Sequence, residues 1–118
     1  MKKIFCGKIE DGYDSELLVG DEIIAEELEN SDFEGKKIHL RYTVSNSPID
    51  PNAVDEKILK TIHGELEAEH GCIPYSEWTG FVGWDDTLVV GGHDLREELL
   101  SYEGHYCYLE LYTSDSIA

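Results

Sequence analysis

Phe5-Cys-Gly-Lys-Ile-Glu10 returns later in the chain as Ile62-His-Gly-Glu-Leu-Glu67, with apolar residue, glycine, apolar residue and glutamate in the same slots. Three further blocks recur in the same order. They are Leu18-Val-Gly20 with Val89-Val-Gly91, Ile24-Ala-Glu-Glu-Leu28 with Leu95-Arg-Glu-Glu-Leu99, and Glu34-Gly-Lys-Lys-Ile-His-Leu40 with Glu103-Gly-His-Tyr-Cys-Tyr-Leu109. Four blocks in one order indicate an internal duplication.

Each block of the first copy has a structural interpretation. Alternating apolar residues predict a strand over 5–10, and residues 17–19 predict a second, short strand that ends at Gly20. Asp21 is suited to be the N-cap of a short helix with one apolar face. Gly35 ends that helix, and 37–44 alternate again as a third strand. The repeated unit is therefore strand–strand–helix–strand.

The second copy predicts the same elements, with Asp94 as N-cap, a helix over 95–102 and a last strand over 105–113. Between the copies, Asp50-Pro51 is typical of a helix start. Residues 61–69 fit either a strand or a continuation of that helix, because short apolar runs carry both spacings. The repeat alignment favours the strand, and a helix here would carry Gly64 at a cost of about 1 kcal/mol.

These elements predict one domain of α+β class, mainly β. The expected architecture is a small closed or partly open barrel built from the duplicated unit with pseudo-twofold symmetry. Repeat 1 covers about 3–44, a linker with a short helix about 45–60, and repeat 2 about 61–113, with an aromatic-rich insert at about 70–86.

The order of strands and helix, with Val19-Gly20-Asp21 at the end of the second strand, resembles the unit of the cradle-loop β-barrels. These include the double-psi and swapped-hairpin barrels. The second copy has Gly92 in place of the aspartate. The resemblance implies a barrel fold and transfers no activity, because this fold class serves enzymes, chaperone-like domains and binding modules alike.

Charge is the strongest compositional feature, at −17 for 118 residues. Between Ile9 and Gly35 there are eleven carboxylates and no Lys or Arg, and after Lys60 the only such residue is Arg96. Such a chain repels nucleic-acid phosphates and anionic membranes, so we expect neither as a direct partner. The charge serves solubility alone or attracts a basic protein.

Other sequence features predict a cytoplasmic location. The first residues lack the apolar core of a signal peptide, and no apolar run approaches the length that a bilayer requires. The three cysteines, Cys6, Cys72 and Cys107, are odd in number and include no CxxC pair. We therefore expect no disulfide framework.

No catalytic motif and no cofactor site are expected. His93-Asp94 has the composition of a dyad, but adjacent residues of an extended segment point in opposite directions. His63, His70 and Cys72 lack the spacing of a zinc site, and the acidic loops at 11–16 and 85–86 lack a calcium-loop pattern. The sequence therefore predicts no metal ligands.

Aromatic residues are the candidate binding residues. The insert carries Trp78, Phe81 and Trp84, and Asp85-Asp86 is interpreted as the turn of a hairpin. The last strand carries Tyr106, Tyr108 and Tyr112 on one face, where the first copy has Lys37, His39, Arg41 and Thr43. These tyrosines are either covered by Trp78 or Trp84, or open as a contact surface.

Three functions remain open. The favoured one is a non-enzymatic binding or inhibitor protein that engages a basic protein, as nucleic-acid mimics, phage-type inhibitors and immunity proteins do. The second is a ligand-binding or hydrolytic barrel that uses the aromatic insert, and a closed pocket beside His70 and His93 would favour it. The third is a structural subunit of a homo-oligomer that buries the tyrosine face.

Overall fold

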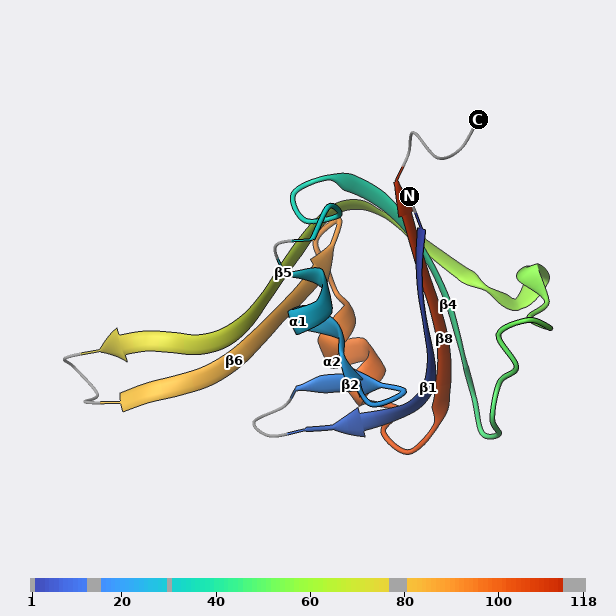
Figure 1. Cartoon of the computed structure of the whole chain (residues 1–118), viewed down its shortest axis with the longest axis horizontal. Coiled ribbons are helices and arrows are strands. Elements are labelled where there is room, and N and C mark those ends of the chain that lie inside the picture. Colours follow the sequence, from blue (N-terminus) through green and yellow to red (C-terminus); the bar gives the residue numbers. More distant parts are fainter. Residues whose placement is uncertain (1, 13–15, 30, 77–80, 114–118) are drawn as a thin grey trace.

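The computed structural model describes residues 2–12, 16–29, 31–76 and 81–113, and for 71–76 and 81–85 it describes the backbone alone. These residues form a sheet of eight strands with two short helices, a mainly β member of the α+β class. The strand order is β3-β2-β1-β8-β4-β5-β6-β7, and all pairs are antiparallel. The sheet curls into an open half-barrel (Figure 1).

The elements follow the expected order along the chain. They are β1 (Lys2–Asp11), β2 (Leu17–Val19), β3 (Glu22–Ile23), α1 (Ile24–Leu28), β4 (Lys37–Ser45), a 3-10 turn (Glu56–Ile58), β5 (Lys60–Ser76), β6 (Phe81–Val90), β7 (His93–Asp94), α2 (Leu95–Leu100) and β8 (Tyr106–Thr113). Neither helix of the described chain has the length and apolar character that a membrane crossing requires.

The core fills the hollow of the curled sheet. Alternate residues of the strands point into it, as in β4, where Ile38, Leu40 and Tyr42 are buried. The two helices lie in the same hollow (Figure 1) and add fully buried side chains such as Leu28 and Leu95. Each such side chain contributes about 1.5–3 kcal/mol of hydrophobic free energy. The opposite face of the sheet is its outer face.

Two glycine pairs mark the closest approaches of the backbone. A Cβ on Gly7 would lie 2.8 Å from the nitrogen of Gly20, and a Cβ on Gly64 would lie 2.8 Å from the nitrogen of Gly91. The amide of Gly20 donates to Lys8 O at 3.1 Å, and that of Gly91 donates to Glu65 O at 3.0 Å. Equivalent positions of the two sequence blocks therefore have the same local geometry.

The strand interpretation of 61–69 is confirmed, since β5 begins at Lys60. The helix predicted after Asp50-Pro51 is wrong, because only the 3-10 turn forms there. Asp50 Oδ1 accepts from the amide of Asn52, and Asp55 Oδ1 accepts from the amide of Lys57, both at 2.9 Å. Such local turns satisfy amides that a helix would otherwise use, and they compete with it.

Asp94 and Asp21 have different roles. Asp94 caps α2 as predicted, because its Oδ1 accepts from the amide of Glu97 at 3.0 Å. The capping role predicted for Asp21 is wrong. Its φ is 68°, beside Gly20 at 60°, so the two form the turn between β2 and β3. Two successive positive φ angles are typical of a type I′ hairpin turn, which favours Gly, Asn and Asp.

The β5–β6 hairpin extends beyond the core as a long two-stranded ribbon (Figure 1). The turn predicted at Asp85-Asp86 is wrong, because β6 runs from Phe81 to Val90 and Asp86 pairs with His70. The reason is alternation: Asp86 occupies the same inward row as Leu88 and Val90 and is itself buried. The composition of Asp85-Asp86 is typical of a turn, but Asp86 is a core-facing strand residue.

Candidate carboxylate–histidine site

At the base of the ribbon, where the β5–β6 hairpin extends out of the core, the inward-facing side chains change from apolar to polar. On β5 the inward row runs Leu66, Ala68, His70, and on β6 the opposing residue of His70 is Asp86. Glu16, immediately before β2, is the third member and is 8% exposed. We call these three residues the Glu16–His70–Asp86 triad.

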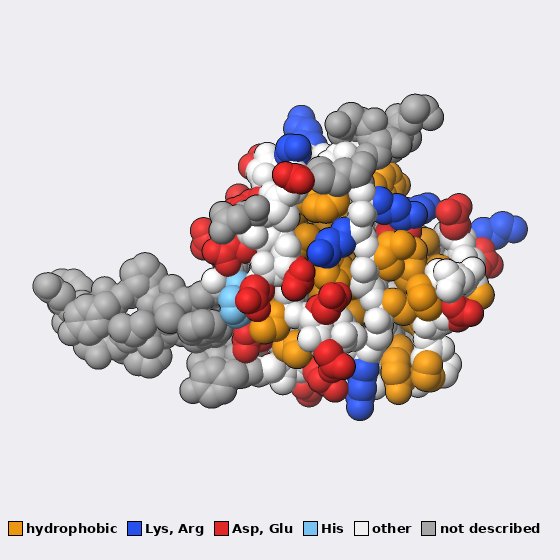
Figure 2. All heavy atoms as spheres, in the orientation of Figure 1, with side chains coloured by type: hydrophobic (Ala, Val, Ile, Leu, Met, Phe, Trp, Pro, Cys, Tyr) orange, Lys and Arg blue, Asp and Glu red, His pale blue; other side chains and the backbone are white. Residues whose placement is uncertain are grey.

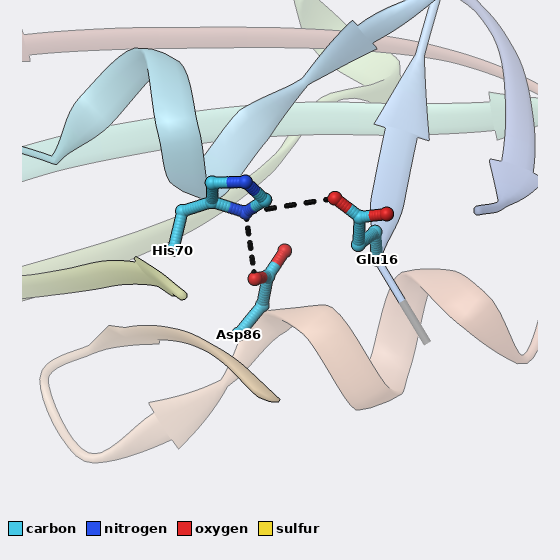
Figure 3. Close-up of side chains that lie close together, drawn as sticks. All are labelled: Glu16, His70 and Asp86. Carbon is cyan, nitrogen blue, oxygen red and sulfur yellow. Dashed lines mark hydrogen bonds and ion pairs between the residues drawn. The ribbon is translucent and has the colours of Figure 1, made fainter. Parts of the chain in front are cut away.

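The triad is close-packed around one imidazole nitrogen (Figure 3). His70 Nδ1 lies 2.9 Å from Asp86 Oδ1, a hydrogen-bonding distance, and 3.6 Å from Glu16 Oε2. One ligand atom from each of the three residues lies within 4.8 Å of the others. The side chains are 15% exposed for His70, 11% for Glu16 and 1% for Asp86. The triad is therefore mostly buried and open at the imidazole and Glu16.

Carboxylates near α1 hold His70 in place. The backbone amide of His70 donates to Glu29 Oε2 at 2.8 Å, across 41 residues of sequence. Glu26 Oε2 lies 3.9 Å from His70 Nε2, on the opposite side of the ring from Asp86. Both imidazole nitrogens therefore face carboxylates. One nitrogen and two oxygen donors at such distances fit a metal ion, and a His–Asp pair also fits proton transfer.

Sequence spacing missed this arrangement. Spacing along the chain groups His70 with His63 and Cys72. His63 points to the outer face, where its ring lies 5.9 Å from that of His39, and the side chain of Cys72 lies outside the described residues. The sequence does contain a signal for the triad, because His70 and Asp86 are polar residues at inward-facing positions of their strands. Recognising that they are neighbours requires the β5–β6 register.

The outer face of the sheet carries the outward-facing rows of β4 and β8 side by side. β4 and β8 are neighbours, so the row of His39 and Arg41 lies beside the row of Tyr108, Glu110 and Tyr112. The rings of His39 and Tyr112 stack at 5.3 Å with 13° between their planes. The guanidinium of Arg41 lies 5.5 Å from the centre of the Tyr112 ring.

Glu110 is a buried carboxylate on this face, at 2% exposure. Arg41 donates to it, Tyr108 Oη donates to Oε2 at 2.7 Å, and Lys2 Nζ lies 3.5 Å away. Burial raises the pKa of Glu110, but these hydrogen bonds and positive charges outweigh burial, so the pKa lies below its usual value. Burial and the bond to Glu110 raise the pKa of Tyr108 to about 12.

The predicted aromatic binding residues are divided between two regions. Tyr106 and Tyr112 are half-buried on the outer face, while Tyr108 is 5% exposed and so is covered. Phe81 and Trp84 lie on β6 in the ribbon and only their backbone is described, and Trp78 lies outside the described residues.

The segment between β4 and the 3-10 turn lies near Tyr108. Ile49 O accepts a hydrogen bond from Cys6, and Cys6 is the cross-strand neighbour of Tyr108.

His93 bonds to Glu98, not to its neighbour Asp94. Tyr42 Oη donates to the other oxygen of Glu98 at 2.7 Å. Burial, followed by this hydrogen bond, raises the pKa of Tyr42 well above its usual value. His93 and Glu98 link β7 to α2 at a partly exposed position, where the pair has a structural role.

Comparison with protein-family models, curated proteins and solved structures finds no match to this chain.

Proposed function

We propose that this protein is a non-enzymatic binding protein whose acidic surface engages a basic protein partner. The observation that carries the proposal is a row of exposed carboxylates, Glu65, Glu67 and Glu69, at alternate positions of β5. Together with Glu34 they line an open groove of about 400 Å³. Figure 2 shows acidic side chains gathered over α1 and the base of the ribbon.

The spacing of the row suggests the form of the partner. Alternate residues of a strand lie about 6.7 Å apart and on one side. An extended basic segment would present Lys or Arg with the same period, so each carboxylate would meet one cation. The charge of −17 would add long-range attraction and accelerate encounter.

The test begins with affinity capture of the partner from the native host, followed by binding kinetics on the purified pair. The on-rate should fall steeply with salt as the Debye length shrinks below about 8 Å. Replacing Glu65, Glu67 and Glu69 with glutamine should slow association at least about tenfold at low salt. A tight complex whose on-rate ignores both salt and this variant would refute the proposal.

A matched control removes the same charge elsewhere. Glu22→Gln, Asp32→Asn and Glu97→Gln together neutralise three exposed carboxylates that do not line the groove. This variant should slow association much less than the β5 variant. Equal effects would show that total charge, not the row on β5, attracts the partner.

We also infer that the fold arose by duplication with pseudo-twofold symmetry. The matching geometry of the Gly7–Gly20 and Gly64–Gly91 pairs supports this inference. Superposing residues 3–44 on 61–113 without the insert in an experimental structure tests it. The resemblance to cradle-loop barrels stays a prediction at the level of the fold.

A cytoplasmic location is part of the same proposal. Cys6 and Cys107 are both free thiols, as a reducing compartment favours.

A further inference from the structure

The strongest feature that partner binding leaves unexplained is the Glu16–His70–Asp86 triad. His70 and Asp86 lie on the inward rows of β5 and β6 and Glu16 is buried beside them, whereas the proposed partner surface is the exposed row on β5. The β5–β6 hairpin and the segment before β2 bring one imidazole and two carboxylates together. Side chains of this kind are costly to bury, and the His70–Asp86 hydrogen bond at 2.9 Å offsets part of that cost.

Charge within the triad favours a cation. Two carboxylates carry two negative charges, and His70 offsets one of them when protonated and none when neutral. Glu26 and Glu29 add further negative charge beside the same ring. A divalent cation would balance both carboxylates of the triad and would leave the imidazole neutral as a ligand.

The two distances from His70 Nδ1 fit a small transition-metal ion, and the two carboxylates lie within 4.8 Å of each other. Zn–N and Zn–O bonds of about 2.0–2.1 Å in tetrahedral geometry place the ligand atoms roughly 3.3 Å apart. His70 Nδ1 lies 2.9 Å from Asp86 Oδ1 and 3.6 Å from Glu16 Oε2, on either side of that value. Binding would replace the hydrogen shared by His70 and Asp86 with the metal. Three protein ligands would leave a further position for water.

The surroundings have the features of an outer ligand shell. A metal-bound histidine commonly directs its other nitrogen at a carboxylate. With Nδ1 on the metal, Nε2 of His70 faces Glu26 at 3.9 Å. Glu29 fixes the backbone of His70 from the end of α1.

We propose that Glu16, His70 and Asp86 bind a divalent transition-metal cation, with imidazole Nδ1 and one oxygen of each carboxylate as ligands. The imidazole and the carboxylates together suit Zn²⁺, and the two carboxylates also suit Mn²⁺. Mg²⁺ is disfavoured, because it prefers oxygen ligands in near-ideal octahedral geometry. The ion joins the base of the β5–β6 ribbon to the segment before β2. It therefore fixes the ribbon relative to the core.

The experiment uses the full chain without a polyhistidine tag, after dialysis against a chelator. Calorimetric titration with Zn²⁺ and with Mn²⁺ should give one site per chain, and Mg²⁺ should bind far more weakly. At about 100 times the dissociation constant, metal should raise Tm by on the order of 10 °C. Because Zn²⁺ also binds thiolates, the titrations are repeated in Cys72→Ser, where the site should persist.

Two ligand variants and one control decide the assignment. Glu16→Gln and His70→Gln should each weaken binding roughly 100-fold, while His93→Gln, which removes an exposed histidine from the His93–Glu98 pair, should leave it unchanged. If His70→Gln fails to fold, Glu16→Gln alone carries the test. Absence of stoichiometric Zn²⁺ or Mn²⁺ binding, or equal binding in Glu16→Gln and wild type, would overturn the proposal. Neither result bears on the β5 carboxylate row.

Discussion

Four glycines allow two close contacts between backbones, because they have no side chain. The contacts are Gly7 with Gly20 and Gly64 with Gly91. Gly64 has a φ of 145° and Gly91 a φ of 58°, and their backbones are in contact. The atoms that an added Cβ would meet belong to the backbone, so no rotamer change relieves the clash. The space is required by the crossing of β5 and the turn after β6.

Gly64→Ala should lower the free energy of unfolding by about 3 kcal/mol or more, since it combines an unfavourable φ with the backbone clash. Gly104→Ala is the matched control. Gly104 has a φ of 91°, but a Cβ there meets nothing within 4 Å, so only about 1–2 kcal/mol should be lost. Urea denaturation measures both. Equal losses in the two variants would show that the positive φ alone requires glycine at position 64, and that the close contact with Gly91 does not.

Glu110 predicts a pH dependence with a definite sign. Its pKa is lowered in the folded protein, so its contribution to stability is fully present above the unfolded value of about 4.3. That contribution is lost as pH falls through the lower folded pKa, because the proton then binds the unfolded chain more tightly.

Glu110→Gln should therefore flatten the fall in stability below about pH 4.3 and cost about 1–3 kcal/mol at neutral pH, where Arg41 and Tyr108 lose a charged acceptor. Glu67→Gln, at an exposed position of β5, should change neither. Denaturation between pH 3 and 7 measures the slope. An unchanged slope in Glu110→Gln would contradict this account of the outer face.

Each of the two helices is preceded by an aspartate, and substituting the two aspartates should have different effects on stability. Asp94 caps α2, whereas Asp21 lies in a turn with positive φ. Asp94→Ala should lower the free energy of unfolding by about 1 kcal/mol, because α2 loses its side-chain cap. Asp21→Gly should be neutral or stabilising, because glycine adopts the positive φ of this turn without strain. Thermal denaturation distinguishes them, and destabilisation by Asp21→Gly would show a further role for its carboxylate.

The ribbon should be separable from the core. The hairpin extends beyond the core (Figure 1). Gly91 N donates to Glu65 O, and hydrogen-bonded pairs alternate along the ladder, so the pair of Gly71 and Asp85 has the register that a two-residue turn requires. Replacing 72–84 with Asn-Gly should therefore leave a folded domain with a similar denaturation midpoint. Circular dichroism and urea denaturation check this. An unfolded product would show that the aromatic insert, including Phe81 and Trp84, belongs to the core.

The same deletion tests the aromatic binding hypothesis. If Trp78, Phe81 and Trp84 contact the partner, the shortened chain will fold but bind it at least about tenfold more weakly. Unchanged affinity in a folded product would remove these residues from the binding surface. Tyr106 and Tyr112 remain in the shortened chain and are tested by separate alanine variants.

Sequence patterns predicted the strands and helices more accurately than the turns and caps that connect them. The alternation in 37–44 and the Asp94 cap are local signals, and the structure confirms both. The turn at Asp85-Asp86 and the cap at Asp21 failed because each composition fits two local structures. Only pairing with a distant strand selects between them. The triad was missed for the same reason, since its members become neighbours through strand register.

Across the whole molecule, repulsion among the carboxylates opposes folding. A net charge of −17 is confined within principal extents of 50 × 33 × 19 Å. At 10 mM salt the Debye length is about 30 Å, so charges repel one another across much of the molecule. At 0.5 M it is about 4 Å, and only adjacent groups still interact.

Salt should therefore stabilise this protein. Because screening relieves repulsion that the expanded chain largely avoids, Tm should rise by on the order of 5 °C between 10 mM and 0.5 M NaCl. The variant with Glu65, Glu67 and Glu69 replaced by glutamine should have a higher Tm at 10 mM and a smaller gain with salt. Chloride is the right anion because sulfate would strengthen apolar burial by exclusion. A Tm that falls with NaCl would mean that the ion pairs of Arg41, Lys2 and Lys3 outweigh the repulsion among the carboxylates.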